Sequence, residues 1–249
     1  MTAGVSDESV SRMRQVAFHK VGGLAYSGEN YGVYSDLARR MASVPKAPQE
    51  IVYEVTKDAG MIHQYCVLRE EMFRRIWSLE HFSAERDAVD DNSDIMIARQ
   101  GRQCIGGGRA TYSTVQKRQR LPLESDDFTL ANVLPELRLN ACNYYEVTRV
   151  AVLPEFAKDN VVLELIGRIL SRSIGERASY CFFISPMTMT RTHRRVVNRL
   201  GYTLTTRQDI EIPDREEYEG IRMHLSYVDL TAYLPLQSQP ARALEMSGI

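Results

Sequence analysis

The chain has 249 residues, of which 44% are hydrophobic and 25% charged, and its net charge is −1. A chain of this size and composition can bury a core, and its balanced charge gives no reason to expect nucleic acid or a membrane as partner. No stretch approaches the roughly 18 apolar residues of a membrane span, and the opening MTAGVSDESVSRMRQ lacks the apolar segment of a secretory signal. We therefore expect a cytoplasmic protein without membrane association.

Residues 1–48 differ in character from the rest of the chain. The stretches SDESVSRMRQVAFHK and YSDLARRMASV could each form a short capped helix, and glycines and prolines interrupt the remainder. We predict three parts: a helical extension over 1–48, one folded domain over 49–235 and a frayed tail over 236–249.

The first half of the domain alternates strands and a helix. Residues 50–56 alternate like a strand, and residues 59–82 carry apolar side chains at helical spacing. Residues 93–99 and 103–112 read as two strands of a hairpin, in which Gly101 can adopt a positive φ. The glycines from Gly106 to Gly108 lie within the second of these strands, which indicates a bulge or a close approach of a ligand to the backbone.

The second half contains a strand–helix–strand unit. A less regular segment after residue 112, with a short helix near 127–134, is longer than an ordinary connection and suggests a functional loop or lid. A strand over 144–153, a helix over 159–178 and a strand over 179–186 come next. A further helix over 188–200 stops at Gly201, and strands over 202–212 and 220–230 close the domain.

The fold class that follows is α+β (α/β). The strand–helix–strand unit requires parallel neighbours, whereas the hairpins before and after it require antiparallel ones. We predict a single mixed, mostly antiparallel sheet with helices on both faces.

The second half resembles the GNAT acyltransferase superfamily, on the segments RVAVLPEFAKDNVVLELIGRIL, YCFFIS and VVNRLGYTL. The resemblance implies that the strands over 144–153 and 179–186 splay apart and hold the pantetheine arm of an acyl thioester. The groove residues it implies are Val150, Val152, Phe183 and Ser185. The sequence departs from the common pattern twice, because EFAKDN contains no glycine and Val197 occupies the position of an acid tyrosine.

A narrower likeness connects the chain with the LuxI-type autoinducer synthases and the N-acyl amino acid synthases. It covers roughly residues 50–205 and depends on LREEMF, ERDAVDD, GGGR and YEVTR, in this order. The charged and aromatic residues that it implicates are Arg69, Phe73, Trp77, Glu85, Asp87, Asp90, Arg109, Glu146 and Arg149. RLPLESDDF and TRVAV are more similar to the N-acyl amino acid synthases, which join a fatty acyl group to an amino acid.

Amide formation from a thioester needs a base for the amine and a means of stabilising the oxyanion. Glu146 is the first candidate base, with a pKa that burial would raise, and Glu85 is the second. Arg109 and Arg149 could bind the carboxylate of the acceptor, or could pair with Asp87 and Asp90. The alternative for all these charges, Arg69 included, is an ion-pair network that only holds the first helix and its loop on the sheet.

Two further features have open interpretations. Phe73 and Trp77, one helical turn apart, fit core packing or the wall of an acyl tunnel. The basic run VQKRQR at 115–120 fits a solvated loop or a docking patch for acyl carrier protein, which is acidic.

His193 is expected at the surface, and His63 and His81 lack the spacing of metal ligands, so no metal is expected. The cysteines at 66, 104, 142 and 181 form no Cys-x-x-Cys pair and are expected to be reduced.

The sequence therefore favours transfer of an acyl group from acyl carrier protein or CoA to the amine of a small molecule, an amino acid, without a permanently bound cofactor. An acyl-homoserine lactone synthase that uses S-adenosylmethionine is the alternative on the same fold. A catalytically silent acyl-binding module is the alternative of another class.

One geometric question concerns the two charges in YEVTR. Residues three apart on a regular strand point to opposite faces of the sheet, so Glu146 and Arg149 would not share a site. A β-bulge between them would add a residue and bring both to one side.

Overall fold

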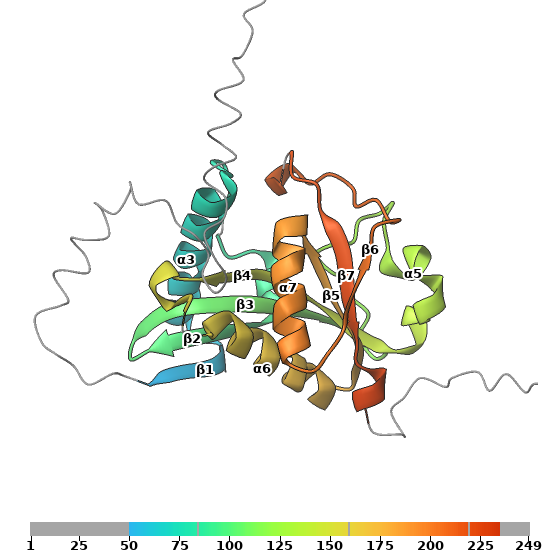
Figure 1. Cartoon of the computed structure of the whole chain (residues 1–249), viewed down its shortest axis with the longest axis horizontal. Helices are drawn as coiled ribbons and strands as arrows, with labels where there is room; N and C mark the ends of the chain where they lie inside the picture. The colour runs from blue at the N-terminus through green and yellow to red at the C-terminus, as the bar shows by residue number, and fades with distance from the viewer. Residues whose placement is uncertain (1–49, 84, 159, 219, 235–249) are drawn as a thin grey trace, which may run out of the picture.

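The computed structural model describes residues 50–234 except 84, 159 and 219 (Figure 1). Its seven strands form one sheet in the order β1-β2-β3-β4-β5-β7-β6. They are β1 (Ile51–Thr56), β2 (Ser93–Gln100), β3 (Gln103–Ser113), β4 (Asn143–Val152), β5 (Ala178–Ser185), β6 (Leu204–Arg207) and β7 (His224–Asp229). All neighbours are antiparallel except β4 and β5, which confirms the mixed, mostly antiparallel sheet.

The helices lie on both faces of this sheet, as predicted. They are α3 (Ala59–Trp77), α4 (Ala88–Asp91), α5 (Leu130–Val133), α6 (Val161–Gly175) and α7 (Met187–Arg199). A Cβ on Gly107 would touch the ring of Tyr65 in α3, and one on Gly108 would approach Ile169 in α6, so α3 and α6 cover opposite faces. Helices α6 and α7 lie together on one face (Figure 1). No helix among the described residues is both long and apolar enough to cross a bilayer.

Helix boundaries follow from local chemistry. The Asp58 side chain accepts a hydrogen bond from the backbone N–H of Met61 at 2.7 Å, which satisfies one of the orphan donors at the start of α3. The helix ends at Trp77, five residues earlier than the predicted 82, and its C-cap Ser78 takes a left-handed φ of 55°. Strand β6 is also shorter than predicted, because the chain after Arg207 turns and Arg207 binds the carboxylate of Asp209.

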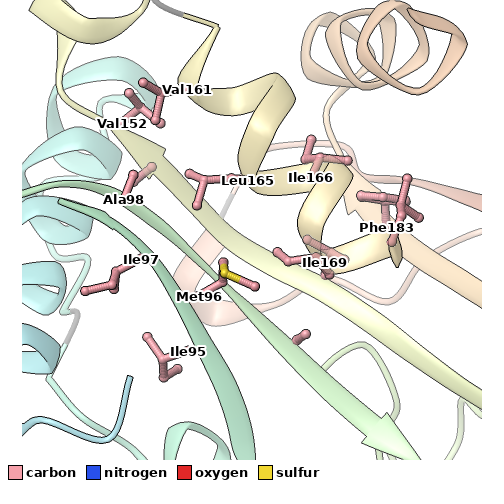
Figure 2. Close-up of a cluster of buried hydrophobic side chains, with 14 of the residues drawn as sticks. Ile95, Met96, Ile97, Ala98, Val152, Val161, Leu165, Ile166, Ile169 and Phe183 are labelled. Atoms are coloured by element: carbon pink, nitrogen blue, oxygen red, sulfur yellow. The ribbon is translucent and has the colours of Figure 1, made fainter. Parts of the chain in front are cut away.

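The main core fills the space between the sheet and its helices. Figure 2 shows Leu165 of α6 above Met96 of β2, and Ile166 of the same helix beside Phe183 of β5. Ile169 belongs to the same cluster. These side chains are almost completely buried, and burying each stabilises the fold by about 1.5–3 kcal/mol. The spacing at 165, 166 and 169 is one face of a helix, so the apolar period of the sequence directly sets the packing of α6 on the sheet.

A second apolar cluster covers the other face near β5 and β7. The long segment between β3 and β4 supplies most of it, and Tyr180 and Phe182 of β5 complete the contact. Its members from that segment are Leu121, Leu123, Phe128, Leu130, Leu134, Leu139 and Cys142. The segment predicted as a loop or lid is thus a packed cover with α5 in it.

Strands β4 and β5 separate halfway along their length. Their residue pairs run from Asn143 and Ala178 to Glu146 and Phe182 and then stop. Beyond that point β4 remains paired with β3 as far as Val152, while β5 remains paired with β7 as far as Ser185. The predicted splay of the central strands is therefore present, and it begins at Glu146.

Candidate active site

A small cavity lies where β4 and β5 part. Its volume is about 50 Å³. Strand β4 supplies residues 146–150, and α3 supplies Phe73 and Trp77. Further lining comes from β5, α7 and the segment between β6 and β7. The site is thus assembled from elements on both faces of the sheet, which meet through the gap between the two strands.

Glu146 is the most unusual group of this cavity. Its side chain is completely buried, Oε2 accepts a hydrogen bond from the backbone N–H of Leu123 at 2.8 Å, and Oε1 has no partner among the described residues. Burial raises the pKa of Glu146 to about 8, and the Leu123 hydrogen bond and the charges of Arg215 and Arg109 oppose that rise. A carboxyl with this pKa can exchange a proton near neutral pH.

Arg149 brings the second charge to the same cavity by means of a bulge. The register of β3 against β4 shifts between Gly107 and Arg109, and Arg149 takes a left-handed φ of 58° at that point. The phenol of Tyr65 donates to the carbonyl oxygen of Arg149 at 2.7 Å and so holds the bulge. The β-bulge considered from the sequence is therefore present, and both charges line one cavity.

The guanidinium of Arg149 is only partly satisfied. Nη2 donates to Glu217 at 2.5 Å, and the guanidinium carbon lies 4.7 Å from the ring centre of Phe82. Nη1 is buried without a hydrogen-bond partner among the described residues. The cavity thus presents one unpaired acceptor, on Glu146, and one unpaired donor, on Arg149.

The other predicted charges form a buried network. Arg69 donates two hydrogen bonds to the carboxylate of Asp90, at 2.9 and 2.7 Å. Arg109 donates to the carboxylates of both Asp90 and Asp87. Asp87 also caps α4 and accepts from the backbone N–H of Asp90. Burial would raise the pKa of Asp90, but hydrogen bonds and charge from Arg69, with the charge of Arg109, hold that pKa below its ordinary value.

This network connects the first helix with the sheet. Arg109 extends it to the cavity, where its Nε donates to the hydroxyl of Thr148 at 2.9 Å. Arg69, Asp87 and Asp90 do not line the cavity. Glu85 also lies outside it: its side chain is exposed, and its backbone carbonyl accepts a hydrogen bond from Arg69. These contacts are those of the ion-pair interpretation, and a role in substrate binding stays a prediction.

Aromatic side chains close one side of the cavity. Phe73 stacks on Trp77 at 5.3 Å and on Phe82 at 4.7 Å, and Tyr218 lies against all three rings. Phe73 is buried and Trp77 is half-buried. The two predicted aromatics therefore contribute to packing and also line the cavity.

The four residues predicted for the thioester groove divide into two pairs. Val150 and Ser185 line the cavity. Val152 and Phe183 belong to the main core, where Figure 2 shows them beside α6. The two core residues face the packed helix rather than the gap between the strands.

Several cavity residues escaped the sequence analysis. Arg215, Glu217 and Tyr218 come from the segment between β6 and β7, which carries no motif. His193 was expected at the surface, but its exposed fraction is only 8%, so that expectation was wrong. The helical spacing of Thr190, His193 and Val197, which form the buried face of α7, could have revealed it.

The basic run at 115–120 is exposed but partly engaged. Arg118 donates to the carbonyl oxygens of Cys142 and Asn140, and Arg120 pairs with Asp126. A docking role for this run stays a prediction.

Comparison with known proteins places the fold. No protein-family profile and no curated protein matches the chain. A candidate acetyltransferase from Acinetobacter baylyi ADP1 is 12% identical with a TM-score of 0.50, covering 77% of this chain and 97% of that chain. The AHL synthase LasI is 14% identical with a TM-score of 0.47, over 73% of this chain and 91% of its own.

FeeM, an N-acyl amino acid synthase from uncultured soil microbes, is 12% identical with a TM-score of 0.47, over 77% of this chain and 98% of its own. At these identities a likeness is evidence for the fold alone. The likeness to the Acinetobacter baylyi protein, with its TM-score of 0.50, shows that this chain has the same fold as that protein. The strand order, with one parallel pair that parts at Glu146, is that of the GNAT-type fold expected from the sequence.

Proposed function

We propose that this chain is an N-acyltransferase that moves an acyl group from a pantetheine thioester to the amine of an amino acid. The observation that carries this proposal is the fully buried carboxyl of Glu146 in the gap between β4 and β5, whose Oε1 has no partner among the described residues. A buried polar atom without a partner is costly, and in a native cavity its natural partner is a ligand. The fold shared with a candidate acetyltransferase agrees with acyl transfer.

The divergence of the strands supplies a place for the donor. From Val147 to Val150 the edge of β4 that faces β5 has no ladder partner in the described part of the chain. Its backbone groups can bond the amides of a pantetheine arm, as an added strand would. A cavity of about 50 Å³ is far below the usual size of a small-molecule pocket, so we infer that the gap widens when the donor enters.

The two unpaired groups match an amino acid acceptor. Glu146 Oε1 can accept a proton from the α-ammonium group, and Arg149 Nη1 can donate to the α-carboxylate. The neutral amine then attacks the thioester carbon, the C–N bond forms, and the C–S bond breaks with its electron pair on sulfur. A second proton leaves the nitrogen and neutralises the thiolate, and Glu146 releases the first proton to water. The products are therefore an N-acyl amino acid, a free thiol and one proton.

Purified protein incubated with acyl-CoA and acyl carrier protein thioesters of several chain lengths, together with mixed amino acids, tests this proposal. We expect release of free thiol and an N-acyl amino acid detected by mass spectrometry. Adding S-adenosylmethionine to the acceptors would reveal a lactone product if the chain were an autoinducer synthase. Absence of turnover with every donor and acceptor would refute acyl transfer.

A matched pair of variants assigns the base. Glu146→Gln keeps the shape of the side chain and should lower turnover by at least about 100-fold, the range expected for loss of a general base. Glu80→Gln makes the same chemical change at an exposed position outside the cavity and should leave turnover unchanged. Full activity of Glu146→Gln would remove this residue as the base.

A further inference from the structure

His193 lies in the wall of the cavity that faces away from Glu146. Glu146 is in register with Phe182, which belongs to the cluster under the segment between β3 and β4. Ser185 lies on the other face of β5 and contacts His193 and Thr190 of α7. Glu146 and His193 therefore approach the gap between the strands from opposite faces of the sheet.

Two hydroxyl groups lie in a row beside the imidazole. Thr190 Oγ1 lies 2.9 Å from Ser185 Oγ, which in turn lies 3.5 Å from Nδ1 of His193. Thr190 also reaches the carbonyl oxygen of Pro186, at the longer distance of 3.1 Å. The Pro186 carbonyl can only accept, so the Thr190 proton is shared between Pro186 and Ser185. We assign the Ser185 proton to Nδ1, which places the ring proton on Nε2.

The imidazole is neutral in this environment. Its ring lies 5.2 Å from that of Phe183, and burial lowers the pKa of His193 to about 4. Nε2 has no hydrogen-bond partner among the described residues, although His193 lines the cavity. A neutral imidazole with its proton on Nε2 can donate a hydrogen bond to negative charge that develops in the cavity.

We propose that His193 donates a hydrogen bond from Nε2 to the sulfur that departs during acyl transfer, and that Ser185 is the positioning residue for the ring. This inference rests on the proposed function and adds a second catalytic residue to it. The amine and its base occupy the Glu146 side, and the C–S electron pair collects on sulfur at the His193 side. No proton passes from the imidazole, because the second proton of the amine finally neutralises the thiolate.

Two isosteric variants separate this role from a structural one. His193→Gln can place an amide N–H at the former position of Nε2, whereas His193→Asn can reach only the position of Nδ1 and Ser185. With the pantetheine thioester that the wild type uses, we expect His193→Asn to lower kcat about 100-fold, the loss typical of one preorganised donor. His193→Gln should retain activity within about tenfold of the wild type.

A change of leaving group gives the decisive readout. The 4-nitrothiophenyl thioester of the same acid releases a weakly basic thiolate that needs little stabilisation, so His193→Asn should slow it by less than about fivefold. Ser185→Ala should show the same selective loss, but smaller. Equal losses on both donors, or no loss on either, would overturn the proposal while leaving acyl transfer intact.

Failure of the proposed function gives a different pattern. A wild-type protein inactive with both donors would refute acyl transfer, and the role of His193 with it. Glu146→Gln should slow both donors alike, because the amine must lose its proton whichever thiol departs. Circular dichroism and a thermal melt of each variant show whether a loss of activity reflects unfolding.

Discussion

Replacing Glu146 with glutamine should change how stability depends on pH. The carboxyl has a pKa of about 8 in the folded protein, against an ordinary value of 4.5, because the folded state buries it. Between these two values the folded state holds a proton that the unfolded chain has released. Stability is therefore greatest below about pH 4.5 as far as this group is concerned, and it is lost as pH rises to about 8.

The size of the effect follows from the same two values. Each tenfold change in acidity corresponds to about 1.4 kcal/mol, so a pKa raised from 4.5 to about 8 sets an upper limit of about 5 kcal/mol. A domain of this kind has a total stability of about 5–15 kcal/mol, so the difference is measurable. Glu146→Gln removes the titration and can keep the hydrogen bond from the backbone N–H of Leu123.

Urea unfolding of the wild type and Glu146→Gln between about pH 5 and 9 measures this term, with Glu80→Gln as control. We expect the variant to gain several kcal/mol relative to the wild type as pH rises, whereas Glu80→Gln should follow the wild type throughout. A difference between Glu146→Gln and the wild type that does not vary with pH would refute the raised pKa. Glu146 would then not be a base poised near neutral pH.

Three other predictions concern the site and its support. First, kcat/KM for the donor should rise with pH, reach half its maximum near pH 8 and level above about pH 9, because Glu146 must ionise to accept a proton; a flat profile would contradict this. Second, Arg69→Met should lower the free energy of unfolding by about 3–5 kcal/mol, since it leaves buried Asp90 without its bidentate partner; a loss below about 1 kcal/mol in urea titration would show that Arg109 alone suffices. Third, Gly107→Ala should lower the free energy of unfolding by about 1–3 kcal/mol, because the new Cβ would lie 2.6 Å from the ring of Tyr65. Gly175→Ala has open space around it and should stabilise α6 by about 0.5–1 kcal/mol. Thermal melts of the two alanine variants compare them, and similar melting temperatures would count against the steric argument.

The sequence predicted the elements of the domain because local and tertiary preferences agree there. The apolar period predicted that α6 packs on the sheet, and the turn at Gly101 predicted the β2–β3 hairpin. The strand–helix–strand unit predicted the parallel pair of strands. The site was predictable only as a set of residue types on particular elements. Glu146 and Arg149 reach one cavity through a bulge, and a bulge depends on contacts such as the Tyr65 hydrogen bond, which no pattern within β4 reveals.

Other parts of the site depend on contacts between residues far apart in the chain. Glu217 pairs with Arg149, which lies 68 residues earlier in the chain. Tyr218 packs against aromatic rings whose residues lie more than a hundred positions earlier. His193 has three arginines near it in sequence, which suggested a surface turn, but the helix turns them outward and the imidazole inward. Tertiary packing decided these positions, and the local composition pointed elsewhere.

The bulge at Arg149 explains how a buried strand can carry two charges. A left-handed residue other than glycine costs on the order of 1–2 kcal/mol, so it persists only where neighbouring contacts determine it. Here the Tyr65 hydrogen bond holds its carbonyl and Glu217 holds its side chain. The same bulge lies just beyond the last paired residues of β4 and β5, so the backbone distortion, the opening of the sheet and the two unpaired polar groups occur within four residues of β4. Packing alone requires none of these three features, and their coincidence is what a binding site for a polar ligand requires.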